Sequence, residues 1–182
     1  MAFTEKDIVI EKLNEKHLDI IAEFKSKVRD LENFLKEDAL NNQQNLISVT
    51  YLVFNATKGN LLAYITLLAD SLTIKEDRKL KKYFQKQNIN YSYLPALKVG
   101  RLCVDDDYRD NNIGTLLIKF AIQKAWEINE KCGCRFITID AKTQTIDGSA
   151  PIEFYKKNGF KELITKRRRK EIIPMYLDIF TL

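Results

Sequence analysis

The sequence predicts one mixed α/β domain over residues 1–182, with a central mixed sheet flanked by helices. Apolar runs rich in β-branched residues alternate along the chain with stretches of helical periodicity. The clearest helix, 113–131, is followed by a continuous apolar run at 134–141, which is typical of a strand buried on both faces. With only 6 Gly, 3 Pro and no repeat, the chain offers no linker, so no second domain is expected.

The first half of the chain is expected to form a strand, two helices, a hairpin and a charged helix. Alternation around Ile8 and Ile10 predicts the first strand, and Asn14 is the expected N-cap of the helix that follows. Gly59 lies in the predicted hairpin turn. The predicted elements are, in order, a strand (3–13), two helices (15–25 and 28–40), a hairpin (46–54 and 61–69) and a helix (77–87).

The second half is expected to begin with a loop and a buried strand. Pro151 suits the first turn of a short helix that ends before Gly159. The last two strands are expected to pair across a basic loop. The predicted elements are a loop (88–95), a strand (96–104), the long helix (113–131), a strand (134–141), the short helix from 151, and strands at 160–164 and 172–180.

Composition excludes several function classes. The single histidine, His17, lies at the start of a surface-type helix, where a solvent-facing or capping role is expected, so Ser-His-Asp and Cys-His mechanisms are disfavoured. Three cysteines and one histidine do not suit a disulfide framework or a zinc site, and no metal is expected. The net charge of +5 suits an anionic cofactor and mildly favours a substrate such as RNA.

The chain shows no segment that suggests a membrane location. No apolar run approaches the ~20 residues needed to span a bilayer. The N-terminus carries Glu5, Lys6 and Asp7, which is not the pattern of a signal peptide. We therefore expect a cytoplasmic protein without membrane contacts.

The first motif, Arg109-Asp110-Asn111-Asn112-Ile113-Gly114, joins the apolar strand to the long helix. A tight turn before a helix presents backbone N–H groups and the positive end of the helix dipole to an anion. Gly114 lets a bulky anion approach the backbone, and Arg109 and Thr115 add a charge and a hydroxyl. A diphosphate would suit this site. An ordinary turn capped by Asn111 or Asn112 explains the motif equally well.

The strand before this turn ends in Leu102, Cys103 and Val104. The acidic residues Asp105 to Asp107 that follow cannot continue a buried strand, so the chain is expected to diverge from its neighbour there. Free backbone groups of the strand could then pair with an extended ligand that carries amides. The alternative is a plain parallel strand without a ligand.

The second motif is Phe154-Tyr155-Lys156-Lys157-Asn158-Gly159-Phe160. It places the phenol of Tyr155 near the end of a short helix. With an ordinary pKa of ~10, a phenol is a poor base at neutral pH but a suitable acid toward a thiolate. By itself, the residue is better explained as a core aromatic of a Phe-Tyr pair.

Together the two motifs resemble the GNAT acetyltransferase superfamily, whose signature is Arg/Gln-x-x-Gly-x-Gly/Ala followed by Phe-Tyr-x-Lys-x-Gly-Phe. The second motif matches fully, and the first departs only at Asn112, where the family has glycine. Asn tolerates a left-handed backbone, so the turn should survive. The resemblance implies acetyl-CoA as co-substrate, an acetyl-CoA-binding core over 96–180, and an N-acetyltransferase acting on a primary amine.

The resemblance also implies roles for individual residues. The amine would attack the thioester directly, a backbone N–H of the strand would hold the oxyanion, and Tyr155 would act as general acid. Lys157 would approach the phosphates, although a solvated lysine is an equal explanation. The implied cofactor-binding residues are Leu102, Cys103, Val104, Arg109, Asp110, Asn111, Asn112, Ile113, Gly114, Thr115 and Lys157.

Two other chemical roles are less favoured. Cys103 as an acyl-carrying nucleophile is a weaker idea, because a buried strand cysteine is usually inert. Asp105 to Asp107 are candidates for a general base by position alone, and a solvated acidic loop is the simpler interpretation. No general base is evident.

The sequence does not determine which amine is the acceptor. The strand Leu94–Val104 and the segment Met175-Tyr176-Leu177 resemble GNAT toxins that acetylate aminoacyl-tRNA. Arg101 could bind a carboxylate or phosphate near the acceptor. The basic residues Lys166, Arg167, Arg168, Arg169 and Lys170 could contact tRNA, although a solvated loop is the favoured explanation. A non-catalytic module that binds CoA or RNA, and a homodimer, are also compatible with the sequence.

Overall fold

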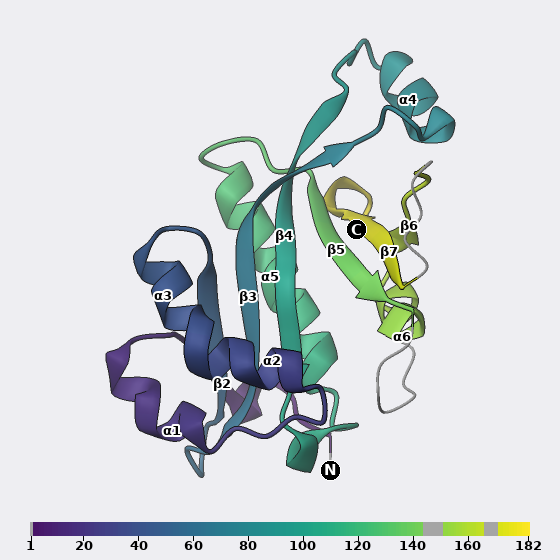
Figure 1. Cartoon of the computed structure of the whole chain (residues 1–182). Helices are drawn as coiled ribbons and strands as arrows, with labels where there is room; N and C mark the ends of the chain where they lie inside the picture. The colour runs from purple at the N-terminus through teal and green to yellow at the C-terminus, as the bar shows by residue number, and fades with distance from the viewer. Residues whose placement is uncertain (1, 144–150, 166–170) are drawn as a thin grey trace. The chain divides into compact units, whose positions relative to one another are not determined.

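The computed structural model describes residues 2–143, 151–165 and 171–182 (Figure 1). Its contacts divide the chain into two compact units, Met1–Leu68 with Val99–Ala121, and Ala69–Lys98 with Ile122–Leu182. Over the described residues, seven strands are hydrogen-bonded in the order β1-β2-β3-β4-β5-β7-β6, and β3 and β4 belong to both units. The mixed α/β class predicted from the sequence is confirmed.

The first unit holds the N-terminal elements and the start of the long helix. In the described residues these are β1 (Ile8–Lys12), α1 (Leu18–Ala22), α2 (Arg29–Asn33), α3 (Ala39–Gln44), β2 (Val49–Asn55), most of β3 (Leu61–Thr73), the second half of β4 (Tyr93–Val104), and the start of α5 (Ile113–Asn129). Antiparallel pairing joins β1 to β2 and β2 to β3. In Figure 1, α2 crosses in front of these strands.

Two faces of this sheet are covered. A buried cluster on the side of the N-terminal helices contains Leu13, Ile21, Phe24, Leu35, Tyr64 and Cys103. On α5, the ring of Phe120 packs edge-to-face on that of Tyr51 from β2, with centroids 4.9 Å apart. Because both faces carry a helical layer, the strands in between are largely apolar, as the sequence predicts.

The second unit contains α4 (Arg78–Gln85), β5 (Phe136–Lys142), α6 (Pro151–Lys157), β6 (Lys161–Glu162) and β7 (Ile172–Asp178). Its core includes Leu72, Phe84, Leu94, Phe136, Leu163 and Tyr176. The predicted antiparallel pairing of the last two strands is confirmed, with Lys161 opposite Tyr176, although β6 is only two residues long.

Several element boundaries differ from those predicted. The first strand begins at Ile8, because Thr4 and Asp7 cap a 3₁₀ turn before it. The predicted helix 15–25 is a 3₁₀ turn capped by Asn14, followed by the short α1. The second helix extends to Gln44 and contains a π-helical segment at Phe34–Asp38. The exposed side chain of Asp140 shows that β5 is not buried on both faces along its whole length.

Candidate active site

The turn between β4 and α5 has the backbone conformation that the first motif requires. Asp110 and Asn112 both have positive φ, at 61° and 67°. The Asn111 side-chain amide donates hydrogen bonds to the carbonyls of Tyr108 and Arg109, at 3.2 and 3.0 Å. The expectation that Asn112 can adopt the left-handed conformation of the family's glycine is confirmed. The turn is therefore closed by its own polar groups.

The start of α5 keeps N–H groups available for an anion. Asn112 directly precedes the helix, and its carbonyl accepts a hydrogen bond from Leu116. Among the described residues, its side chain makes one hydrogen bond, as a donor to the Phe3 carbonyl at 3.5 Å, and so does not cap the helix. The first N–H groups of a helix have no intrahelical acceptor. This geometry favours the anion-binding interpretation over an ordinary capped turn.

The side chains of Ile113 and Arg109 both contact other parts of the chain at this turn. The Ile113 side chain is buried, so only its backbone could face a ligand. The Arg109 Nε lies 2.9 Å from the Asp106 carboxylate, and its side chain is 32% exposed. Part of the positive charge expected to face a diphosphate is thus balanced within the chain. A role for Arg109 in cofactor binding stays a prediction.

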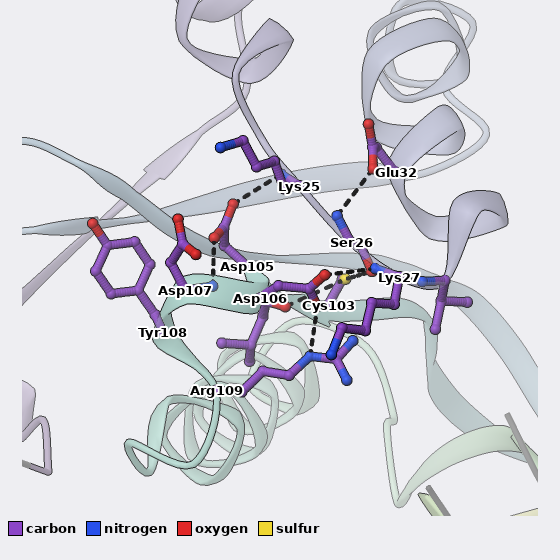
Figure 2. Close-up of polar contacts among 12 residues, drawn as sticks. Lys25, Ser26, Lys27, Glu32, Cys103, Asp105, Asp106, Asp107, Tyr108 and Arg109 are labelled. Carbon is purple, nitrogen blue, oxygen red and sulfur yellow. Dashed lines mark hydrogen bonds and ion pairs between the residues drawn. The ribbon is translucent and has the colours of Figure 1, made fainter. Parts of the chain in front are cut away.

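The acidic residues after β4 attach an N-terminal segment to the turn (Figure 2). The Asp105 carboxylate accepts hydrogen bonds from the backbone N–H groups of Lys25, at 2.8 Å, and Asp107, at 3.0 Å. Asp106 accepts one from the N–H of Lys27, also at 2.8 Å. Asp105 is buried, so its expected place in a solvated loop is wrong. Its oxygens are occupied by N–H donors, which makes it a poor candidate for a general base.

Cys103 is held in a protonated, unreactive state. Its side chain is buried, and its Sγ lies 3.3 Å from the Ser26 hydroxyl oxygen. Burial raises the pKa of the thiol to about 11. Because the thiolate is the nucleophile, this environment supports the expectation that Cys103 carries no acyl group.

The ladder between β4 and β5 is short. Parallel pairing covers Ala96–Lys98 of β4 and Phe136–Thr138 of β5 in the described residues, although β4 continues to Val104. Leu102, Cys103 and Val104 therefore lie beyond the part of β4 that pairs with β5. This is the arrangement expected for a strand edge that can pair with the amides of a ligand.

Two polar pairs of the second unit lie where this ladder ends, and the sequence analysis missed them. The Lys98 ammonium is 2.7 Å from the Asp140 carboxylate. The Thr138 hydroxyl donates a hydrogen bond to Asp70 at 2.5 Å. The signal that could have revealed them is the interruption of the apolar runs of β4 and β5 by single polar residues.

Tyr155 lies in α6 of the second unit, among aromatic rings. Its side chain is 7% exposed and packs edge-on against Phe154 and Phe160, with centroids 5.1 and 5.6 Å away. Gly159, with φ of 87°, ends the helix and returns the chain so that the Phe160 N–H bonds to the Tyr155 carbonyl. The motif thus fixes the ring, and its role as an acid stays a prediction.

The remaining predicted residues have simpler surroundings. Lys157 is exposed, as a solvated lysine would be, whereas Lys156 pairs with Glu162 at 3.1 Å. His17 accepts a hydrogen bond from the Asn14 N–H through Nδ1, which confirms its capping role. The basic residues Lys166 to Lys170 lie outside the described residues.

The described residues contain neither a metal-binding cluster nor a membrane-spanning helix. In the ranges 2–143, 151–165 and 171–182, no group of three or more His, Cys, Asp or Glu could hold a metal ion. Within the same part of the chain, none of the helices has the length and apolar character of a bilayer span.

A left-handed turn between a strand and a long helix, in a seven-stranded mixed sheet over the described residues, is the arrangement expected of an acetyl-CoA-dependent acetyltransferase. Residues 54–162, more than half of the chain, match the acetyltransferase (GNAT) domain, and the chain belongs to this family. It is therefore a GNAT acetyltransferase that uses acetyl-CoA.

Solved structures with the same fold include those of the toxin AtaT and of KacT. AtaT complexed with acetyl-methionyl-tRNAfMet is 20% identical, with 96% of each chain covered and a TM-score of 0.79. A tyrosine-to-phenylalanine mutant of KacT is 19% identical, with 96% of each chain covered and a TM-score of 0.77. AtaT carrying the same type of mutation, bound to the C-terminus of the antitoxin AtaR and acetyl-CoA, is 19% identical over 96% of this chain and 95% of that chain, with a TM-score of 0.72. At these identities the likeness shows the fold.

Proposed function

We propose that this chain transfers the acetyl group of acetyl-CoA to the α-amino group of an aminoacyl-tRNA. The observation that carries the proposal is the likeness of fold to AtaT complexed with acetyl-methionyl-tRNAfMet, which extends over 96% of both chains. A resemblance restricted to the cofactor-binding part would favour any GNAT acceptor equally. Here the likeness includes the N-terminal helices as well.

The residues of the first unit suit two parts of the coenzyme, its pyrophosphate and its pantetheine arm. The turn at 109–115 supplies N–H groups at the start of α5 for the pyrophosphate. Leu102 to Val104 supply backbone groups, beyond the β4–β5 ladder, for the amides of the pantetheine arm. Acetyl-CoA contributes a thioester, whose carbonyl carbon is open to attack by an amine.

The proposed chemistry needs one acid and no strong base. The neutral amine attacks the thioester carbonyl, the carbon–sulfur bond breaks, and the Tyr155 hydroxyl donates its proton to the departing sulfur. The proton released by the amine restores the tyrosine through solvent. An aminoacyl ester amine is less basic than a lysine, whose pKa is ~10.4, so more of it is neutral at physiological pH.

Direct attack agrees with the environment of the other candidate groups. The Cys103 thiol, with its pKa raised to about 11, is not suited to carry the acetyl group. The Asp105 carboxylate is buried and accepts two backbone hydrogen bonds. Contact of tRNA with Lys166 to Lys170 is part of the proposal and rests on their charge alone.

A transfer experiment tests the proposed function. The purified chain is incubated with acetyl-labelled acetyl-CoA and either charged tRNA, uncharged tRNA or free amino acids. We expect label only in charged tRNA, and mild base should release it together with the amino acid ester. Label in free amino acids or in protein would keep the acetyltransferase and refute this acceptor.

A further inference from the structure

Arg101 is an exposed cation on a strand whose neighbouring positions are buried. Side chains alternate along β4, so Val99, Arg101 and Cys103 share one face. Val99 and Cys103 are buried there, and Cys103 contacts Ser26 of the N-terminal segment. Arg101 itself stays exposed, with its guanidinium 5.0 Å from the centre of the Phe34 ring. It therefore lies on the face of the strand that the N-terminal helices cover.

The Arg101 guanidinium lies over a stacked pair of aromatic rings, Phe34 and Tyr64. Phe34 stacks on the Tyr64 ring, with centroids 6.4 Å apart and an interplanar angle of 21°. The Tyr64 hydroxyl donates a hydrogen bond to the Leu31 carbonyl at 2.6 Å, which ties the stack to α2. Phe34 also begins the π-helical segment, a distortion that is frequent at functional sites. Stacking of this kind orients an arginine before a ligand arrives.

Among the residues that the structure describes, no carboxylate neutralises the charge of Arg101. One N–H donates to the Gly100 carbonyl at 2.8 Å, and no carboxylate pairs with the side chain in the part that the structure describes. Glu32, one of the two acids of α2, is engaged by the Lys36 ammonium at 2.6 Å and the Ser26 N–H at 3.0 Å. The remaining N–H groups of the planar guanidinium are thus available to an anion.

We propose that Arg101 is a specificity residue that binds a phosphate of the acceptor. This inference rests on the proposed function, because an aminoacyl-tRNA carries its amino acid as an ester and has no free carboxylate beside the amine. The anion nearest to the reacting group is then a backbone phosphate, which a guanidinium binds in a bidentate manner. Arg101 directly precedes Leu102 to Val104, where the pantetheine arm of the coenzyme is proposed to lie.

The test compares two acceptors that differ in their phosphates. Initial rates are measured with aminoacyl-tRNA and with the same amino acid esterified to adenosine, which has no phosphate. For Arg101→Met, which keeps an apolar stem over Phe34, kcat/KM should fall about 10- to 100-fold with aminoacyl-tRNA, mainly through KM, and stay unchanged with aminoacyl-adenosine. Arg101→Lys should recover part of the loss, because it keeps the charge without the planar fork.

Control measurements separate this role from a structural one. Arg78→Met removes an exposed arginine of α4 and should change neither rate. Thermal unfolding and the acetyl-CoA Kd of Arg101→Met should match those of the unmutated protein. An equal loss with both acceptors, or no loss with aminoacyl-tRNA, would overturn the phosphate role while the proposed function stands.

Two further outcomes distinguish a failure of the proposed function from a different anion at Arg101. If the unmutated protein acetylates no aminoacyl-tRNA, the proposed function fails and this inference fails with it. If it acetylates a free amino acid far faster than the corresponding amide, and Arg101→Met removes that preference, the anion is a carboxylate and the phosphate is refuted.

Discussion

Asp105 and Lys25, 80 positions apart in the sequence, are joined by a hydrogen bond of 2.8 Å from the Lys25 backbone N–H to the Asp105 carboxylate. The return contact is made by the next residue, since the Asp106 N–H donates to the Lys25 carbonyl at 3.1 Å. The N-terminal segment is thereby paired, like a short strand, with the residues that lead into the proposed phosphate turn. Its position and that of the turn depend on each other (Figure 2).

Replacing Asp105 should therefore destabilise the first unit. In Asp105→Asn, one carboxylate oxygen becomes an amide nitrogen, which cannot accept from the partly buried N–H group of Lys25 or of Asp107. We expect the free energy of unfolding, measured by urea titration, to fall by about 1–3 kcal/mol. Asp107→Asn changes an exposed neighbour and should leave stability nearly unaltered. Equal stabilities of the two variants would contradict the structural role of Asp105.

Asn112 offers a test of the left-handed turn. A φ of 67° costs alanine more conformational free energy than it costs asparagine. The free energy of unfolding of Asn112→Ala should therefore fall by about 1 kcal/mol, and the variant should bind acetyl-CoA more weakly. The matched control is Asn88→Ala, because Asn88 has a φ of 59° in the turn after α4. It should lose similar stability without any change in acetyl-CoA affinity, as measured by calorimetry. If both variants bind the coenzyme equally well, the turn is not its site.

The variant Tyr155→Phe distinguishes the proposed role of the hydroxyl as an acid from the packing of the aromatic ring. The variant keeps the ring contacts with Phe154 and Phe160, so thermal stability and the acetyl-CoA Kd should stay close to those of the unmutated protein. Loss of a general acid should lower kcat by about 100- to 10,000-fold. Tyr91→Phe, at a position with 74% exposure, is the control for loss of a hydroxyl. An unchanged kcat for Tyr155→Phe would remove this residue from the mechanism.

The elements with strong local patterns were predictable from the sequence. The long helix was expected at 113–131 and is observed at Ile113–Asn129, because its apolar period is a local signal. The start of β4 at Tyr93 was missed, since the segment 88–95 is rich in Asn and Tyr and was expected to be a loop. Proline removes only the N–H, and the Pro95 carbonyl still accepts a bond from Arg135. The turn motif was likewise predictable, because its left-handed positions favour Asn and Asp.

Features that depend on distant partners were not predictable. Nothing near Asp105 in the sequence reveals that a backbone segment 80 residues away satisfies its carboxylate, so the acidic run was assigned to solvent. The π-helical segment at Phe34–Asp38 also left no signal, because the apolar pattern around it still fits an ordinary helix. The support of Arg101 depends on that segment. Long-range packing, rather than local propensity, therefore shapes this part of the candidate site.

Two buried groups, the Cys103 thiol and the Tyr64 hydroxyl, should make the free energy of unfolding fall at high pH. Burial raises the pKa of the Cys103 thiol to about 11 and that of the Tyr64 hydroxyl well above its usual value. The folded state thus retains protons that the unfolded state has released, so the stabilising contribution is complete below pH ~9 and is lost as the pH rises toward 11. For Cys103 alone, the full loss is about 3 kcal/mol in the free energy of unfolding.

The variant Cys103→Ala isolates this contribution. Its free energy of unfolding, measured by urea titration between pH 8 and pH ~11, should decline less steeply than that of the unmutated protein, whatever its absolute stability. Cys132→Ala changes an exposed thiol and should keep the original slope. Parallel slopes for Cys103→Ala and the unmutated protein would mean that the thiol ionises in the folded chain as readily as in water. That result would reopen the case for Cys103 as a nucleophile.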